Sequence, residues 1–255
     1  MDRKIKKYGW IPDLPDARDH MYAAPAPVLA ALPTKMDLRP QCPGVLDQGD
    51  LGSCTANAIA NAHLFDQLKQ HAPKPFLPSR LFIYYNERAM EGTVNTDSGA
   101  MIRDGIKSIA QQGACPESLW PYVIAKFTTK PTKKCYQEAL KYQALSYQRL
   151  VQITSQLKGC LAAGYPFVFG FTVYESFETQ AVATTGTVPM PAPTEKVLGG
   201  HAVLAVGYDD STQRFIVMNS WATTWGMKGF FTMPYLYLTD PHLASDFWTV
   251  RLVKA

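Results

Sequence analysis

The sequence predicts an α+β fold, with a mostly helical N-terminal lobe followed by a mostly antiparallel β C-terminal lobe. Two observations support this prediction. Apolar residues recur every three or four positions between about residues 54 and 112, which is typical of helices with one buried face. After Gly164, short runs rich in Val, Phe and Tyr alternate with turn residues, which is typical of strands. At 255 residues the chain is long enough to form two lobes that share an interface.

Three helices are expected in the first half. Their ranges are Cys54 to about Gln70, Ser79 to Met90, and about Ala100 to Gln112. Ala58, Ala62 and Phe65 would line the buried face of the first helix. Ser79 suits the N-cap of the second helix, and Gly113 suits the end of the third.

The second half is expected to form an antiparallel sheet or barrel. Its candidate strands are YPFVFGFTVY, HAVLAVGYDD, RFIVMNSW, GFFTMPY and FWTVRLV. A long irregular loop is expected from about Glu178 to Gly200, and loops of that length are often functional.

Residues 1–36 form a proline-rich leader with neither a helical nor a strand period, so we expect it to run extended over a surface. The folded domain is expected to span residues 37–255. Its helical lobe would cover about residues 50–115, and its β lobe about residues 160–255. Tyr8, Trp10 and Tyr22 favour a leader that packs against that domain.

Composition and charge exclude several classes of protein. The net charge of +4 is mild, and the one basic run, MDRKIKK, has no interleaved aromatic residues, so the sequence does not predict nucleic-acid binding. No run of about 18 apolar residues predicts a membrane span. The start of the chain lacks the pattern of a secretory signal. The location is therefore left open: cytoplasmic if the protein has no export signal, or exported by a route not visible in this chain.

The five cysteines are spread singly, at Cys42, Cys54, Cys115, Cys135 and Cys160. No CxxC pair is present, so the sequence predicts neither a zinc site nor a redox dithiol. Whether Cys42, Cys115, Cys135 and Cys160 form disulfide bridges is left open.

Cys54 is the candidate nucleophile, because it stands where the glycine-rich turn of QGDLGSC gives way to a helix. Unpaired N–H groups and the dipole at a helix N-terminus favour a thiolate. A cysteine at a helix start can also be purely structural, so the thiol needs a partner base before it indicates catalysis.

His201 is the candidate base, because it alone among the five histidines lies at an apolar strand, after Gly199-Gly200. Asn219 follows the next strand, in NSWATTWGMKGFF, and its amide could orient the imidazole ring. Trp221 could shield that hydrogen bond from water.

With His201 147 positions and Asn219 a further 18 positions beyond Cys54, the chain resembles the papain-like (C1 family) cysteine peptidases. The matching stretches are LPTKMDLRP, QGDLGSC, GGHAVLAVGY and NSWATTWGMKGFF, so the resemblance runs from about Leu32 to the C-terminus. It implies two lobes with the active site in a cleft between them, and the hydrolysis of peptide bonds in peptides or proteins.

The resemblance also implies a role for each matching residue. Cys54 would be the nucleophile, His201 the base and then the acid, and Asn219 the residue that orients the His201 ring. Gln48 would supply an oxyanion-hole donor together with the Cys54 backbone N–H. The expected substrate-binding residues are Ser98, Gly99, Gly200, Ala202 and Trp221. No metal or cofactor is implied, and a monomer is expected.

Departures from the family pattern are informative. Leu51 replaces a usual cysteine, and the stretch VNTDSGAM lacks the cysteine that would pair with it. Thr55 replaces an aromatic residue, and Gly200 replaces Asp or Asn. The short leader and the missing bridge resemble a bacterial branch of the family. We expect the leader to lie across or beside the groove and to restrain access; a strap that only packs on the lobes is the alternative.

Two other functions fit the same motifs. A papain-fold amidase or acyltransferase would use the same nucleophile. A non-catalytic binding module would keep the fold with an inert Cys54, although all four candidate catalytic residues are present.

Overall fold

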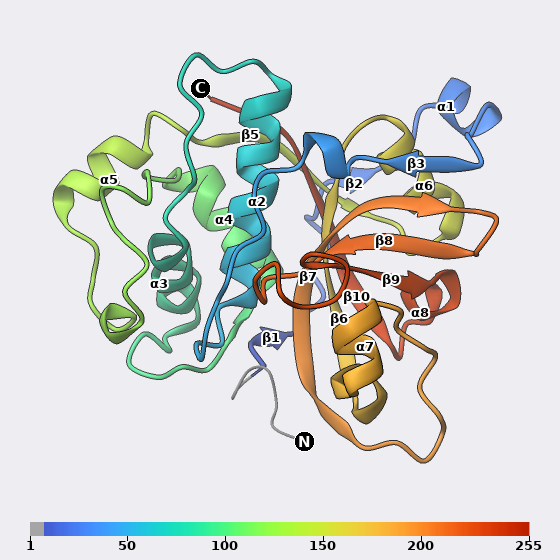
Figure 1. The fold of residues 1–255 in the computed structure, drawn as a ribbon. Helices are drawn as coiled ribbons and strands as arrows, with labels where there is room; N and C mark the ends of the chain where they lie inside the picture. The colour runs from blue at the N-terminus through green and yellow to red at the C-terminus, as the bar shows by residue number, and fades with distance from the viewer. Residues whose placement is uncertain (1–7, 255) are drawn as a thin grey trace.

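The computed structural model describes residues 8–254, and the basic run at residues 1–7 lies outside the described residues. Helices gather on one side of the molecule and a large sheet on the other (Figure 1). The helices of the first side are α2 (Cys54–Lys69), α3 (Arg80–Glu91), α4 (Ile102–Gln111) and α5 (Lys133–Ala139). The predicted ranges of α2, α3 and α4 agree with the structure to within about two residues.

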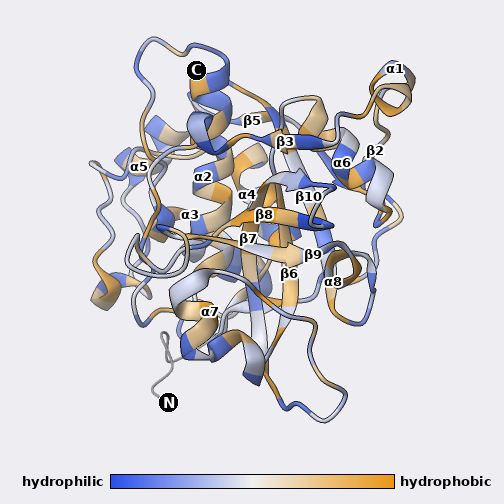
Figure 2. Cartoon of the chain, turned by 45° about the vertical axis from the view of Figure 1, so that its right-hand side comes forward, coloured by the Kyte–Doolittle hydropathy of each residue, from blue (hydrophilic) through white to orange (hydrophobic). Residues whose placement is uncertain are grey.

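The large sheet contains most strands of the second half. They are β5 (Ala144–Leu150), β6 (Phe167–Tyr174), β7 (Val197–Asp209), β8 (Arg214–Met218), β9 (Phe230–Pro234) and β10 (Ala244–Val253). Together with β2 (Met21–Tyr22), their order in the sheet is β2-β5-β10-β6-β7-β8-β9, so within residues 8–254 the sheet is open and does not close into a barrel. All of its pairings are antiparallel except that of β2 with β5. Hydrophobic colour runs along much of β6, β7 and β8 (Figure 2).

Helix α2 packs between the other helices and the sheet, so its surroundings are protein on nearly every side. Thirteen of its sixteen residues are buried, and many of them are alanines. A helix that is buried all round is a core helix. Small side chains let β7 approach α2 closely, and this contact brings the start of α2 to the sheet.

The leader is more structured than the sequence predicts. It contains β1 (Trp10–Ile11), β2 (Met21–Tyr22), the short helix α1 (Ala26–Ala30) and β3 (Lys35–Asp37). Each strand pairs with a strand of the folded domain: β1 with β4 (Ala100–Met101), β2 with β5, and β3 with β7. These pairings are long-range in sequence, which is why the local pattern did not reveal them.

The predicted loop from Glu178 to Gly200 was also partly wrong. It contains the helix α7 (Gln180–Thr185), and β7 already begins at Val197, four residues before His201. The hydroxyl of Thr179 caps α7 by accepting from the Val182 N–H, and Gly186 ends it in a left-handed conformation. The remaining helices of this half are α6 (Thr154–Ala162) and α8 (Tyr235–Thr239).

Candidate active site

Cys54 is the first residue of α2, as predicted. Ser53 stands before it in the N-cap position without a side-chain capping bond. The turn that leads to it bends at Gly49, which has a positive φ of 58°, and the Gly52 N–H donates to the Asp97 carboxylate at 3.1 Å. These features fix the sulfur at the positive end of the helix dipole.

His201 and Asn219 lie on the sheet, in β7 and directly after β8. The His201 Nε2 and the Asn219 Oδ1 are 2.8 Å apart, so the ring donates from Nε2 to the amide oxygen. The same oxygen accepts from the Ser220 N–H at 2.8 Å. Burial lowers the pKa of His201 to about 4, although the bond to Asn219 opposes this shift.

Trp221 lies against the imidazole, with its ring centroid 5.0 Å from that of His201. It is fully buried, and Phe177 and Trp225 pack edge-on against it at centroid distances of 5.5 and 5.2 Å. This aromatic cluster excludes water from the bond between His201 and Asn219, which strengthens the bond.

The two sides meet at the sulfur. The backbone N–H of Ala202, the residue after His201, donates to the Cys54 Sγ at 3.4 Å. The His201 Nδ1 is buried and has no hydrogen-bond partner among the described residues. Burial raises the pKa of Cys54 to about 12, with the N–H groups of Ala202 and Gly9 opposing the shift. Burial thus favours the neutral form of both the thiol and the imidazole.

Gln48 is fully buried, which its position in a glycine-rich turn did not suggest from sequence alone. Its side-chain Nε2 donates to the Leu51 carbonyl at 2.9 Å, and its Oε1 accepts from the Ser220 hydroxyl at 2.7 Å. Its backbone N–H also donates to the Ser220 carbonyl at 2.9 Å. The amide is thus held by both lobes and folded back over the turn that carries the thiol.

The predicted substrate-binding residues do not all lie in the same environment. Gly99, with a φ of 77°, faces the backbone of Gly9, because a Cβ built on Gly99 would lie 2.3 Å from the Gly9 carbonyl oxygen. The hydroxyl of Ser98 instead donates within its own loop, to the Thr93 hydroxyl at 3.0 Å. Ala202 is buried and contacts the sulfur through its N–H.

The leader occupies the space beside the thiol. A Cβ built on Gly200 would lie 2.6 Å from the Trp10 ring, and one on Gly170 would lie 1.9 Å from it. The Gly9 carbonyl accepts from the Ala100 N–H at 2.8 Å. Tyr8 lies near the imidazole, with its ring centroid 6.1 Å from that of His201. The glycines of the folded domain therefore leave room for leader backbone and for an indole ring.

Sequence reasoning missed the charged network that holds the next part of the leader. Asp13 and Asp19 meet Arg103 of α4 and Arg149 of β5, together with Asp246 of β10. The Arg103–Asp19 pair is 2.6 Å long, and its side chains are 5% and 6% exposed. The indoles also take part: Trp10 Nε1 donates to Asp246 at 3.2 Å and Trp248 Nε1 donates to Asp13 at 2.9 Å. The signal for this network in the sequence was the aspartate-rich stretch PDLPDARD of the leader.

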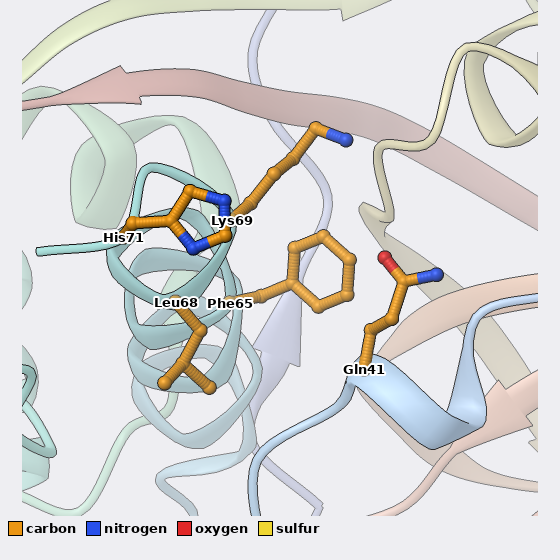
Figure 3. Close-up of a pocket in the computed structure, with 5 residues that line it drawn as sticks. All are labelled: Gln41, Phe65, Leu68, Lys69 and His71. Carbon is orange, nitrogen blue, oxygen red and sulfur yellow. The ribbon is translucent and has the colours of Figure 1, made fainter.

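A cavity of ≈ 390 Å³ lies elsewhere, at the far end of α2 from Cys54 (Figure 3). It is lined by Gln41, Phe65, Leu68, Lys69 and His71. Lys69 lies fifteen positions after Cys54 in the helix, which is a rise of about 22 Å. The cavity is therefore not part of the site. Residues 8–254 hold no group of three or more His, Cys, Asp or Glu side chains that could bind a metal ion, and none of their helices is long and apolar enough to cross a bilayer.

A thiol at a helix N-terminus, opposite a His–Asn pair carried by a sheet, defines the class of papain-type cysteine peptidases. The chain belongs to that family, because the pattern described as "Papain family cysteine protease" matches residues 32–237. It is therefore a cysteine peptidase, a hydrolase that acts on peptides or proteins.

Similar proteins agree with this membership. The solved structure of xylellain, a cysteine protease from the bacterium Xylella fastidiosa, is 46% identical, covers 98% of both chains and superposes with a TM-score of 0.93. A protein of Acanthamoeba polyphaga mimivirus, "Uncharacterized peptidase C1-like protein L477", is 44% identical over 97% of this chain and 88% of its own length. Digestive procathepsin L 3 of Tenebrio molitor, at 17% identity and a TM-score of 0.73, covers 92% of this chain and 74% of its own and shares the fold. The predicted papain-like fold and the resemblance to a bacterial branch are confirmed.

Proposed function

We propose that this peptidase cleaves peptide bonds through Cys54, His201 and Asn219, and that its leader, residues 1–36, restrains access to them. The observation that carries the proposal is the 3.4 Å contact between the Ala202 N–H and the Cys54 Sγ. It joins the strand that bears the base to the helix that bears the thiol. The peptidase domain would then be residues 37–255.

The reaction follows from the geometry of these groups. Once substrate replaces the leader, the His201 Nδ1, which has no hydrogen-bond partner among residues 8–254, takes the thiol proton. The Cys54 sulfur then bonds to the substrate carbonyl carbon. As the C–N bond breaks, His201 returns the proton to the leaving amine. A water molecule activated by the same imidazole then hydrolyses the acyl-enzyme and restores the thiol.

Asn219 and Trp221 keep the imidazole in one orientation throughout. Because the Nε2 proton is held by the Asn219 Oδ1 at 2.8 Å, Nδ1 is the nitrogen left to act as base. The charged imidazolium is stabilised by the same bond in a region that Trp221 shields from water. The nitrogen positions follow from the hydrogen-bond pattern.

Gln48 and the Cys54 backbone N–H would bind the oxyanion that develops on the carbonyl oxygen. One hydrogen of the Gln48 amide group is used by the Leu51 carbonyl, and the other is the candidate donor. Loss of one such donor typically costs about 10²–10³ in turnover. Gly99 and Ser98, with Gly200, Ala202 and Trp221, would line the substrate groove, and the glycines would let substrate backbone come close.

The leader would inhibit in two ways, by occupying the path of the substrate and by excluding water from the Cys54 thiol. Its Gly9 and Trp10 lie where Gly99 and Gly200 would otherwise meet substrate backbone. The leader would add to the burial of Cys54, and burial raises the pKa of the thiol and so disfavours the thiolate, although the Gly9 N–H opposes this effect. Departure of the leader would hydrate the sulfur and bring its pKa back into the range that His201 can reach.

Two measurements test these two parts separately. Iodoacetamide should label Cys54 at mildly acid pH in a chain that lacks residues 1–34, because only a thiolate paired with imidazolium reacts there. A Cys54→Ala variant should neither label at that site nor turn over a peptide substrate. Turnover equal to the parent in Cys54→Ala would exclude the mechanism.

The restraint is tested by comparing the full chain with the chain that lacks residues 1–34. Higher turnover of a short peptide substrate by the truncated chain is expected. Equal turnover and equal substrate affinity in both would exclude a blocking leader and leave the catalytic proposal intact.

A further inference from the structure

The helical lobe contains a second, small apolar cluster that is separate from the main core. Its fully buried members are Phe82, Cys115, Cys135 and Ala139. Two of the chain's five cysteines thus share a cluster of four residues. The mechanism above uses neither of them, and the sequence left their pairing open.

The two cysteines are neighbours in this cluster of four buried side chains. The Cys135 thiol is one of the groups that raise the pKa of Cys115, after burial itself. Backbone contacts hold both positions: the Ser79 N–H donates to the Cys115 carbonyl at 2.8 Å, and the Cys135 N–H donates to the Thr132 carbonyl at 2.9 Å. The Thr132 hydroxyl also contacts the Cys135 Sγ at 3.2 Å. Hydrogen bonds of the backbone therefore hold both cysteines in place.

The other three thiols contact backbone groups elsewhere. The Cys42 Sγ donates to the Leu38 carbonyl at 3.3 Å and the Cys160 Sγ to the Tyr165 carbonyl at 3.5 Å. The Cys54 Sγ accepts from the Ala202 N–H. All five are free thiols in this structure. Cys54 and Cys160 belong to the main core and Cys42 packs against it, whereas Cys115 and Cys135 share the small cluster.

We propose that Cys115 and Cys135 form an intrachain disulfide when the chain folds under oxidising conditions. Each thiol loses a proton and an electron as the S–S bond forms. The electrons and protons reduce one small-molecule disulfide, such as oxidised glutathione, to two thiols by exchange through a mixed disulfide. The exchange takes place during folding, because both sulfurs are fully buried afterwards and burial raises the pKa of Cys115.

The bond would stiffen the wall behind the candidate oxyanion hole. Between the two cysteines, the Tyr122 hydroxyl contacts the Ser53 hydroxyl at 2.6 Å and donates to the Gln48 carbonyl at 2.9 Å. Glu117 pairs with Arg80 at 2.7 Å, and that guanidinium lies 3.7 Å from the centroid of the Tyr122 ring. Joining the two ends of this segment restricts its freedom in the unfolded chain, which stabilises the fold.

The test is oxidative refolding of the full-length chain. The Cys54→Ala background removes the nucleophilic thiol, so that it neither reacts with glutathione nor cleaves the chain. After refolding with reduced and oxidised glutathione, the denatured protein should alkylate at Cys42 and Cys160 but not at Cys115 or Cys135. A digest without reductant should contain a peptide that joins these two positions. The Tm should exceed that of the reduced protein by about 6–12 °C, as expected for a loop of this size in a domain of this length.

Variants decide whether the stabilisation belongs to this pair. Cys115→Ser and Cys135→Ser should each abolish the redox-dependent rise in Tm, whereas Cys160→Ser, which removes an equally buried thiol, should keep it. The proposal is overturned if Cys115 and Cys135 both alkylate after oxidative refolding, or if the joined peptide contains Cys42 or Cys160. The peptide map of the parent decides the matter even if a serine variant fails to fold.

Discussion

The two ends of the leader contact the peptidase in different ways. Its active-site end, residues 8–11, fills space beside Cys54 through backbone and aromatic contacts, with Gly9 against Gly99 and Trp10 against Gly200. Its anchor end, residues 13–19, is held by a buried ion-pair network. The first end overlaps the expected path of a substrate, whereas the second lies beyond it. If the leader restrains access as proposed, obstruction of the substrate would depend on the first end and affinity for the peptidase domain on the second.

The largest effect is expected from breaking the anchor end. Arg103→Ala removes the guanidinium that pairs with Asp19 and donates to the Leu14 carbonyl. Removing one partner of a buried pair typically costs about 3–5 kcal/mol, because the remaining charge is left buried and unpaired. We expect a lower Tm. The ratio of docked to undocked leader should fall by roughly 10²–10³, which is measured as increased turnover of a short peptide substrate.

A double-mutant cycle separates the leader from the peptidase domain. In a chain that lacks residues 1–34, Arg103→Ala should leave turnover nearly unchanged, since the partner Asp19 is absent. Arg18→Ala is the matched control, because Arg18 pairs with Asp16 on the surface and its side chain is 86% exposed. An equal rise in turnover with Arg18→Ala and Arg103→Ala would mean that the buried network is not the anchor.

A smaller effect is expected from the active-site end. Gly9→Ala places a methyl group 1.8 Å from the Gly52 carbonyl oxygen, which is backbone and cannot move aside. Overpacking of this kind typically costs about 1–3 kcal/mol, or roughly 5- to 150-fold in the docked population. Turnover should rise while the Tm changes little, because the anchor network stays intact.

Gly44→Ala provides the control for Gly9→Ala. A methyl group on Gly44 meets no atom within 4 Å, so this variant should match the parent in turnover and in Tm. If Gly9→Ala also leaves turnover unchanged, residues 8–11 do not obstruct the substrate, and the leader is a strap that packs on the lobes.

The difference between local signals and long-range contacts explains what the sequence could and could not predict. Helix α2 and the position of Cys54 at its start were predictable because helix periodicity and the turn before Cys54 are local signals. The contact between His201 and Asn219 was predictable because His201 was expected to open an apolar strand and Asn219 to follow the next one. Helix α7 was missed even though Thr179 and Gly186 are local capping signals.

The position of the leader on the folded domain had no such local signal. Trp10 and Asp246 are 236 positions apart, and their contact depends on the complete sheet. A proline-rich segment with short strands contains too little periodicity to indicate its partners, because each strand is only two or three residues long. The aromatic residues of the leader predicted that it would pack against the folded domain, but the ion pairs that hold it appear only in three dimensions.

The smallest expected effect is on the pH dependence of leader docking. It concerns the anchor end, which carries the carboxyl of Asp13. Burial, and next the nearby Asp246 carboxylate, raise the pKa of Asp13 from 3.8 to about 6, against the opposing effects of the Arg103 and Trp248 contacts. The group also faces Arg149 of β5. A carboxyl with a raised pKa in the docked state takes up a proton on docking, so docking is favoured at low pH and weakens as the pH rises through about 6.

The ratio of turnover by the full chain to turnover by the chain lacking residues 1–34 isolates this effect, because titration of the catalytic groups in the freed site cancels. We expect the ratio to rise roughly tenfold between about pH 5 and pH 7. Asp13→Asn should make the ratio nearly independent of pH in that range, whereas Asp16→Asn should not, since the contact with Arg18 lowers the pKa of Asp16 well below it. A ratio that falls as the pH rises would mean that groups other than Asp13 control release and that acid releases the leader.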